Sequence, residues 1–354
     1  MENTRKLYVD VAKGIAIIAV ILTHVVPGFG KESDSLFFAG VDSFYYSIAR
    51  FCVPVFFMCT GILMLRKEKE LSLKKLYFHN ILRIIVAAAV CGCIYALYDG
   101  LFRGYMDGNL WLALLSQIKG WSQFNLGRDF FYWFVYAIIG MYISLPVIKV
   151  FTDHAGEKEQ KYFLIVWMIC CALQNLARTT TFDFLNGQTD QWKFLGVFCG
   201  YAGYMVLGNY IVGKDFNKRS RHIIYTLGCC SLVVMFVNSF MSRIQYSGHI
   251  TGFDLTQYIS LTGIFYATSV LVFLKYQVVE IKTIFGKALC WLGANTLLIY
   301  LLHYLFVRFF LEDKILMVSL HPIINPVIWV IIILACSVFL VIIVNGLKKI
   351  IKRR

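Results

Sequence analysis

Long apolar segments alternate with short polar segments along the whole chain. A helix needs roughly 20 apolar residues to cross a hydrocarbon core about 30 Å thick, and each apolar segment is about that long. The pattern predicts an all-α polytopic membrane helix bundle with about ten transmembrane helices, forming a single domain over residues 1–354. The predicted spans lie approximately at residues 9–29, 44–65, 80–102, 129–150, 162–178, 194–213, 223–241, 257–276, 290–311 and 324–347.

Lysine and arginine residues are distributed unequally over the segments between these spans. Of the 34 basic residues, 22 lie in segments that share a side of the membrane with the N-terminus, nine lie on the opposite side and three lie within spans. Cytoplasmic segments of membrane proteins carry such an excess of positive charge. Both termini are therefore predicted to be cytoplasmic, in a multi-pass protein of the cytoplasmic membrane.

The composition agrees with a membrane protein and explains the high net charge. Hydrophobic residues make up 59% of the chain and charged residues only 15%, whereas about 25% of the residues in soluble domains are charged. The formal net charge of +14 would suggest a nucleic-acid partner in a soluble protein. Here the basic residues flank the spans and suit anionic lipid head groups, so membrane lipids are expected partners and nucleic acid is not.

Signatures of several enzyme classes are absent from the sequence. The eleven cysteines lie within or at the ends of apolar spans, without a CxxC pair or the Cys/His spacing of a zinc site. We therefore expect neither disulfides nor a bound metal. The sequence also lacks a GxSxG elbow, a phosphate-binding P-loop and an HExxH motif. Acyl or other group transfer at a membrane, or transport, remain as function classes.

Three polar residues share one face of the first predicted span. Asp10, Lys13 and His24 project within about 60° of one another at 3.6 residues per turn. A strongly polar residue within a span costs on the order of 2.5–3.5 kcal/mol, so it usually faces a cavity and carries function. Asp10 and His24 are about 21 Å apart along a straight helix. The partner of His24 must therefore come from another helix.

A second set of polar residues is predicted at the depth of His24, near the outer side of the membrane. Arg50 in the second span reaches this depth from the opposite direction. A polar cavity opening outward would also collect Tyr132, Trp133, Asn175 and His303. Other interpretations stay open, because Tyr and Trp at this depth also form aromatic belts. A lone histidine such as His303 can simply form a hydrogen bond between helices.

The chemistry of His24 and Arg50 suits group transfer to a hydroxyl group. A positive charge near a histidine disfavours its protonation, so an imidazole beside a guanidinium remains a usable general base. His24 is the candidate base that deprotonates a sugar hydroxyl. Arg50 would then stabilise the oxyanion of a tetrahedral intermediate, or bind an acidic acceptor.

The same residues carry a resemblance to a known family. The first span resembles the opening helix of the acyltransferase family 3 integral membrane proteins, whose signature is Arg or Lys, ten residues and then His; Lys13 and His24 meet that spacing. Arg50 shortly before VPVFF, Trp133 in YWF and His303 in IYLLH resemble later motifs of the family in the right order. The chain departs from many members only in having Lys13 where they have Arg.

This resemblance implies a ten-span acyltransferase. Such an enzyme would move an acyl group, usually acetyl, from cytoplasmic acyl-CoA to a hydroxyl of a cell-surface polysaccharide or its lipid-linked glycan precursor. His24 would be the essential histidine, and acyl-CoA would be a donor substrate with no bound cofactor. We expect Asp10, Lys13 and Arg83 near the inner mouth to bind the donor, although basic loop residues such as Lys74 also fit the positive-inside rule.

The acceptor side and one alternative complete the expectations. Tyr132, Trp133, Asn175 and His303 would line the acceptor site. The sequence lacks the extracytoplasmic hydrolase-like domain of peptidoglycan-modifying members, so it resembles the stand-alone bacterial surface-polysaccharide O-acetyltransferases. The alternative is a transporter of a small solute such as serine, because related membrane domains occur in the serine racemases of glycopeptide resistance. No racemase sequence follows Arg354.

Overall fold

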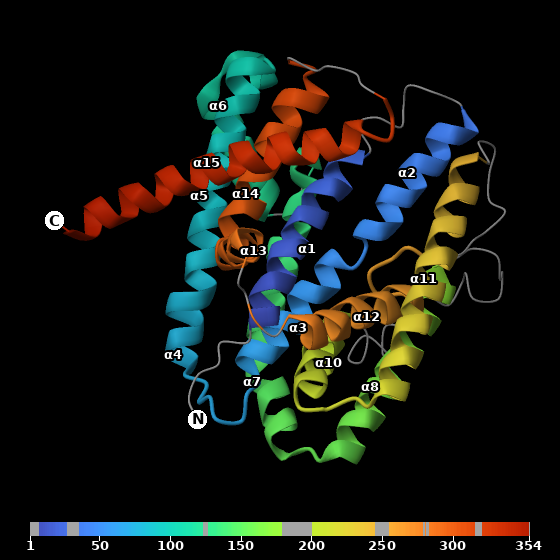
Figure 1. Cartoon of the computed structure of the whole chain (residues 1–354). Helices are drawn as coiled ribbons and strands as arrows, with labels where there is room; N and C mark the ends of the chain where they lie inside the picture. The colour runs from blue at the N-terminus through green and yellow to red at the C-terminus, as the bar shows by residue number, and fades with distance from the viewer. Residues whose placement is uncertain are drawn as a thin grey trace.

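A computed structural model describes residues 7–26, 35–122, 127–178, 200–244, 255–278, 280, 283–315 and 321–353 (Figure 1). Every regular element within these residues is a helix. Six of the helices are long and apolar enough to cross a membrane, and a strongly bent pair makes a seventh if it is counted as one span. This confirms the predicted all-α polytopic bundle.

The helices follow one another with short connections. The first half of the chain forms α1 (Leu7–Val25), α2 (Leu36–Ala49), α3 (Cys52–Met64), α4 (Leu73–Lys75), α5 (Leu82–Phe102), α6 (Leu110–Ser122) and α7 (Trp133–His154). The second half forms α8 (Glu157–Arg178), α10 (Ala202–Val212), α11 (Lys218–Ile244), α12 (Leu261–Gln277), α13 (Ile284–Ala294), α14 (Thr296–Val307) and α15 (Asn325–Arg353). Two π-helical turns, Leu76–Ile81 and Arg308–Glu312, continue α4 into α5 and extend α14.

A helix lies at each of the ten predicted spans. The segments predicted at 162–178, 194–213 and 257–276 correspond to α8, α10 and α12, which are not among the helices that satisfy the length and composition of a complete span. Residues 27–29 and 194–199 of the predicted spans lie outside the described residues. The count of ten transmembrane helices therefore stays a prediction.

Two predicted spans are not single straight helices. The span expected at 290–311 is wrong as a continuous helix, because α13 and α14 meet at an angle of 88°. Asn295 stands at the break, where its side-chain amide donates to the carbonyl of Trp291 and its Oδ1 accepts from Asn345 of α15. These side-chain contacts provide hydrogen bonds at the point where the helix axis turns.

The span expected at 44–65 also differs from the structure. Its helix begins earlier, at Leu36, and is interrupted between Ala49 and Cys52. The interruption has a local cause, because Pro54 lacks an N–H and its ring clashes with the carbonyl four residues earlier, which belongs to Arg50. The chain therefore turns at Arg50, the residue that the sequence singles out in this span.

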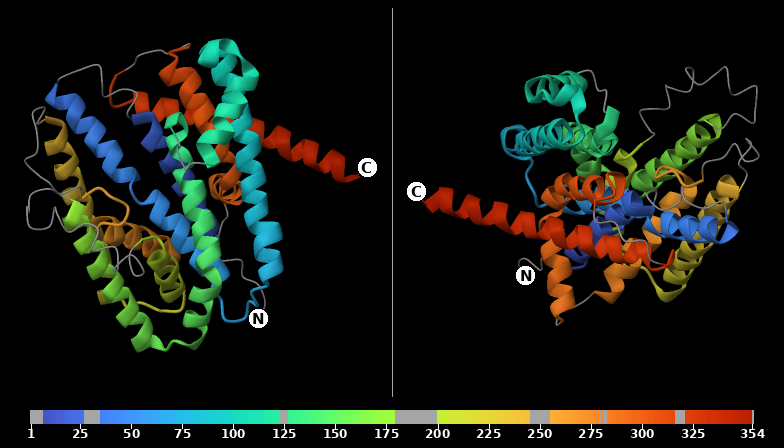
Figure 2. Two further views of the ribbon diagram at one scale, coloured as in Figure 1. Left: turned by 180° about the vertical axis from the view of Figure 1, so that it is seen from behind. Right: turned by 90° about the horizontal axis from the view of Figure 1, so that it is seen from above.

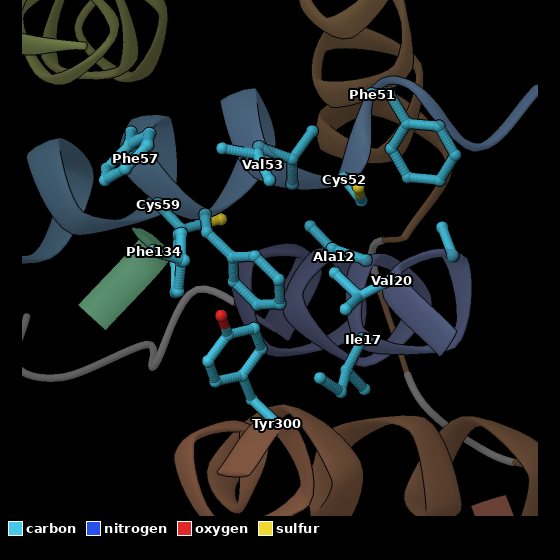
Figure 3. Close-up of a cluster of buried hydrophobic side chains, with 14 of the residues drawn as sticks. Ala12, Ile17, Val20, Phe51, Cys52, Val53, Phe57, Cys59, Phe134 and Tyr300 are labelled. Atoms are coloured by element: carbon cyan, nitrogen blue, oxygen red, sulfur yellow. The ribbon is translucent and has the colours of Figure 1, made fainter. Parts of the chain in front are cut away.

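The first helix forms the centre of the bundle. It packs against α2, α3, α12, α13, α14 and α15. Figure 3 shows Ala12, Ile17 and Val20 of α1 between side chains of α3, such as Phe57, and Tyr300 of α14. All three α1 side chains are buried. Burial of α1 on all sides holds the polar residues of this helix inside the protein.

Glycines allow α1 and α13 to approach each other closely. A Cβ atom on Gly14 would clash with the carbonyl of Leu289, and one on Gly293 would clash with the carbonyl of Asp10. The two contacts are reciprocal, since each helix offers a glycine to the backbone of the other. Small residues at such crossings are typical of membrane helices, whose association depends on close packing.

The two ends of the bundle differ. The N-terminus and the turn between α7 and α8 lie at one end, here called the N-terminal end, whereas α6 lies at the opposite, distal end (Figure 1). Figure 2 shows that α15 crosses the other helices and that its C-terminal part leaves the bundle. The predicted cytoplasmic location of both termini remains a prediction.

Candidate active site

A cavity of about 990 Å³ lies within the bundle, towards the distal end. His24, Arg50, Glu312 and Lys314 are the charged or titratable groups of its lining other than tyrosines. Its remaining wall is largely aromatic and includes Tyr46, Phe56, Phe130, Trp133, Phe134, Tyr201, Tyr258, Tyr300 and Tyr304. Mostly apolar walls with a few polar groups are typical of sites for small molecules.

His24 lies in the last turn of α1, where the central helix brings it to the cavity wall. Three rings surround its imidazole, those of His303 and Tyr304 at 5.2 Å between centroids and that of Phe130 at 5.8 Å. The imidazole remains partly exposed on the side of the cavity. His24 therefore has a fixed surrounding and one open side from which a substrate could reach it.

Arg50 is held by the break between α2 and α3. Its backbone N–H donates to the carbonyl of Ser47, and its side-chain Nε donates to the carbonyl of Thr256 at 2.6 Å. The guanidinium stacks on two rings, 3.7 Å above that of Tyr258 and 4.8 Å from that of Tyr46. Planar stacking of this kind is specific to arginine. With 7% of its surface exposed, the side chain is positioned tightly at the wall.

One wall of the cavity is a layer of aromatic rings. The indole of Trp133 lies nearly parallel to the ring of Tyr258, with 5.9 Å between centroids and 24° between planes. Tyr201 continues the layer, at 5.8 Å from Trp133 and 4.6 Å from Phe57. Tyr204 donates a hydrogen bond to the carbonyl of Tyr258 and so fixes this segment. The result is a flat apolar face beside the guanidinium of Arg50.

The distal wall of the cavity contains an ion-pair network. Glu312 at the end of the π-helical turn accepts a hydrogen bond from the hydroxyl of Tyr304 at 2.7 Å and pairs with Arg103 at 2.6 Å. Arg103 also pairs with Asp313 at 2.8 Å. Burial alone would raise the pKa of Asp313, but hydrogen bonds from Arg103 and Tyr98 outweigh it and lower the pKa. The network joins α5 to the end of α14 beside the cavity.

The structure brings four of the sequence-predicted site residues together. His24, Arg50 and Trp133 line the same cavity. His303 lies directly behind His24 and is completely buried. The predicted depth match between His24 and Arg50 is thus reflected in a common cavity. The roles proposed for these residues stay predictions.

The other predicted residues lie away from the cavity lining. Tyr132 is buried, and its hydroxyl donates to the carbonyl of Ala88. Asn175 is buried on α8. Asp10 and Lys13 form an ion pair of 3.0 Å in the N-terminal half of α1. Arg83 is exposed on α5. Among the described residues that line the cavity, none of these five appears.

Several lining residues were missed by the sequence analysis. Tyr46, Tyr201, Tyr258, Tyr304 and Glu312 come from five separate segments of the chain. Tyr304 has one local signal, since it directly follows His303 in a motif that the sequence analysis used. Glu312 lies beyond the predicted span, in a short charged stretch that resembles an ordinary membrane-flanking loop.

A cluster of basic residues lies at the N-terminal end. Lys149 of α7 is buried, and its Nζ contacts the carbonyl of Arg66 at 2.9 Å and Asp153 at 2.7 Å. Burial, together with the positive charges of Arg66, Lys75 and Lys149, lowers the pKa of Lys69. The cluster concentrates positive charge close to where α1 begins, which would favour an anionic ligand at this end.

Comparison with known proteins identifies the chain. A protein-family model described as an acyltransferase domain, that of acyltransferase family 3, matches residues 6–346. No curated protein and no solved structure gives a significant match. The family match covers nearly the whole length, including every helix that lines the cavity, and the bundle contains several helices that can span a membrane. The chain therefore belongs to acyltransferase family 3 and is a multi-pass membrane acyltransferase.

Proposed function

We propose that this protein transfers an acetyl group from acetyl-CoA to a hydroxyl of a surface polysaccharide or its lipid-linked glycan precursor, with His24 as the general base. The observation that carries the proposal is the shared cavity of His24 and Arg50. It supplies a candidate base and a cation that face one space inside an acyltransferase bundle. The acetyl group, the CoA donor and the glycan acceptor follow the family resemblance.

The reaction would proceed through a tetrahedral intermediate. The open nitrogen of His24 accepts the proton of the acceptor hydroxyl while the hydroxyl oxygen attacks the thioester carbonyl carbon. The electron pair of the carbonyl moves to its oxygen, and Arg50 stabilises the resulting oxyanion. The intermediate then collapses, the C–S bond breaks, and His24 returns its proton to the leaving thiolate. The products are the O-acyl ester and free CoA, and His24 ends neutral.

The distribution of charge supports a donor that enters from the N-terminal end. Lys13 lies about 16 Å from His24 along α1, towards that end. Arg66, Lys69 and Lys149 lie there too, with their positive charges close together. CoA carries phosphate groups at one end and the reactive thioester at the other. Its phosphates would bind at this basic end while its pantetheine arm extends along α1 towards His24.

The aromatic layer supports a sugar as the acceptor. One face of a pyranose ring presents C–H bonds and is apolar, whereas its edge carries hydroxyl groups. Trp133 and Tyr258 form a flat apolar wall of suitable character, and Arg50 stands beside it as a hydrogen-bond donor. A sugar stacked on this wall would direct an edge hydroxyl towards the polar groups of the cavity.

Sealed membrane vesicles of defined orientation test this proposal. We expect radiolabelled acetyl-CoA to acylate the host's surface polysaccharide only when the donor is on the side of the N-terminal end. His24→Ala should lower the rate at least about 100-fold, the usual contribution of a general base. His222→Ala is the matched control, because His222 is exposed on α11 outside the cavity lining. A near-normal rate in His24→Ala would refute the assigned base.

Two further arms separate donor binding and transport. Lys13→Ala should raise the KM for acetyl-CoA and leave the KM for the acceptor unchanged, whereas Lys13→Arg should retain activity because it keeps the charge. A transporter would instead take up its solute without an acyl donor. Saturable uptake of serine, combined with no labelled polysaccharide from either side, would contradict the proposed transferase.

A further inference from the structure

The hydrogen-bonding state of His303 is fixed by its own helix. His303 follows Tyr300 by one turn of α14, and its Nδ1 lies 2.6 Å from the carbonyl oxygen of Tyr300. A carbonyl oxygen can only accept a hydrogen bond, so Nδ1 must carry the hydrogen atom. In a neutral imidazole the other nitrogen, Nε2, then carries a lone pair. His303 is therefore an acceptor at Nε2.

This acceptor is buried without a hydrogen-bond partner in the described part of the chain. His303 has 0% of its surface exposed, and its Nε2 makes no hydrogen bond to any described residue. Buried polar atoms are nearly always satisfied, so an exception calls for an explanation such as a catalytic role or a bound group. The position of the nearest polar ring provides one.

His24 is the nearest ring to His303. The two imidazoles lie 5.2 Å apart between centroids and are tilted by 42°, closer than the rings of Tyr300, Tyr304 and Phe131. Of these neighbours, only His24 also has a nitrogen that can donate at this depth. Within the described residues the imidazole of His24 likewise makes ring contacts and no hydrogen bond. Two imidazoles with unused nitrogens thus face each other.

The nearby carboxylate is already engaged. Glu312 lines the cavity, but its two oxygens bind Tyr304 and Arg103. Tyr304 therefore stands between this carboxylate and His24, as an edge-on ring and not as a hydrogen-bond donor to it. A carboxylate that orients the base, as in a Ser-His-Asp triad, is not found among the described contacts of His24.

We infer that His303 is a positioning residue for His24: its buried Nε2 accepts a hydrogen bond from the inner N–H of His24 and directs the lone pair of the base into the cavity. This inference rests on the proposed role of His24. When His24 takes the hydroxyl proton it becomes an imidazolium, and its inner N–H keeps its bond to His303. The proton does not pass on, so His303 stays neutral and Tyr300 keeps its hydrogen bond.

The proposed contact requires only a small adjustment of two rings that already touch. Because the hydrogen bond is directional, it would select one tautomer of His24, with hydrogen on the inner nitrogen. In the other tautomer the cavity-facing nitrogen would carry the hydrogen and could not act as a base. A residue that selects the tautomer should therefore change the rate of the chemical step more than the binding of either substrate.

Three substitutions separate this role from packing. In His303→Gln the side-chain amide reaches the place of Nε2, so an acceptor is retained. In His303→Asn the amide reaches the place of Nδ1, and the acceptor is lost. In His303→Phe the ring is retained without either nitrogen. We expect kcat to fall about 10- to 100-fold in the Asn and Phe variants, the usual effect of losing such an orienting partner. The Gln variant should be rescued to within about tenfold of wild type.

The Michaelis constants complete this experiment. For all three variants, the KM values for acetyl-CoA and for the acceptor should stay within about twofold of wild type. A purely structural role would instead make Phe the best-tolerated substitution and would lower the yield of folded protein. Normal kcat in the Asn and Phe variants, or a Gln variant as slow as Phe, would overturn the inference.

A spectroscopic measurement tests the inference without a variant or an activity. Protein labelled with [15N]histidine should show a neutral His303 with its hydrogen on Nδ1 and a His24 in a single tautomer. Hydrogen on Nε2 of His303 would overturn the inference even if the enzyme were active. Failure of the proposed function is distinct, because it would appear as absence of acyl transfer in the wild-type protein.

Discussion

The ring of Tyr304 stands edge-on to the imidazole of His24, with 5.2 Å between centroids and 86° between planes. The same tyrosine donates its hydroxyl hydrogen to Glu312, which is paired with Arg103 of the distal network. The ring packs on Phe131, with 4.4 Å between centroids. A residue beside the proposed base is thus anchored both by aromatic packing and by a charged hydrogen bond.

This double anchoring predicts unequal effects of two substitutions at one position. Tyr304→Phe keeps both ring contacts and loses only the bond to Glu312, so it should cost about 1 kcal/mol of stability and slow acyl transfer only a few-fold. Tyr304→Ala also removes the ring beside His24 and should slow the reaction far more. Thermal unfolding and kcat of the two purified variants check this. Equal rates for the Phe and Ala variants would show that the ring contact contributes nothing.

A second prediction concerns the stacked guanidinium of Arg50. Arg50→Lys keeps the positive charge but loses the planar stack on Tyr258 and the Nε bond to Thr256, so we expect kcat to fall at least about tenfold. Arg221→Lys is a matched control, since Arg221 stacks on Tyr276 at 4.4 Å outside the cavity lining. Transfer assays on both variants measure the difference. A normal rate in Arg50→Lys would mean that charge alone suffices.

The distal network predicts how stability depends on pH. Burial opposes ionisation of Asp313, but the hydrogen bonds from Arg103 and Tyr98 prevail and its pKa is lowered in the folded protein. The ionised carboxylate therefore stabilises the fold above the unfolded pKa of about 3.9. This contribution is lost as the pH falls from about 5 through that value towards the lower folded-state pKa.

Thermal unfolding between pH 7 and pH 3.5 measures this effect. The wild-type Tm should fall on acidification, and Asp313→Asn should reduce the size of that fall because its side chain does not titrate. Asp215→Asn is the control, since Asp215 is fully exposed and contacts Lys275 only at 3.9 Å. Identical pH profiles for the wild type and Asp313→Asn would contradict the assigned role of Asp313.

The sequence predicts the layers of this protein better than its helix faces. Apolar runs of about 20 residues identify membrane helices because hydrocarbon thickness sets their length. Depth arguments brought His24 and Arg50 together because two antiparallel helices pass the same level. Tyr132 and Trp133 show the limit. They are neighbours at one depth, yet Trp133 lines the cavity while Tyr132 donates to Ala88 of α5.

The remaining features depend on contacts between distant segments. The break at Asn295 lacks a proline, and it is accompanied by a bond to Asn345 of α15 and by the close approach of α13 to α1. Glu312 reaches the cavity because Arg103, more than 200 positions earlier in the chain, holds it. No local pattern of hydrophobic and polar positions contains such information. By contrast, Pro54 announces the break at Arg50 four residues ahead.

A final prediction tests the close crossing of α1 and α13. A Cβ atom on Gly293 would overlap the carbonyl of Asp10, a backbone group that cannot move aside without shifting α1. Gly293→Ala should therefore cost about 1–3 kcal/mol, as overpacking in a dense interior does. It should also impair acyl transfer, because α1 carries both the Asp10–Lys13 ion pair and His24.

Gly140→Ala is the matched control for this prediction. Gly140 also lies within a helix, α7, but an added Cβ would meet no described atom within 4 Å. Alanine restricts the unfolded chain more than glycine, so this variant should be as stable as the wild type or slightly more stable. Thermal unfolding of both variants in the same detergent gives the comparison. If Gly293→Ala were as stable as Gly140→Ala, the two helices would not be in the backbone contact that holds the polar face of α1 in place.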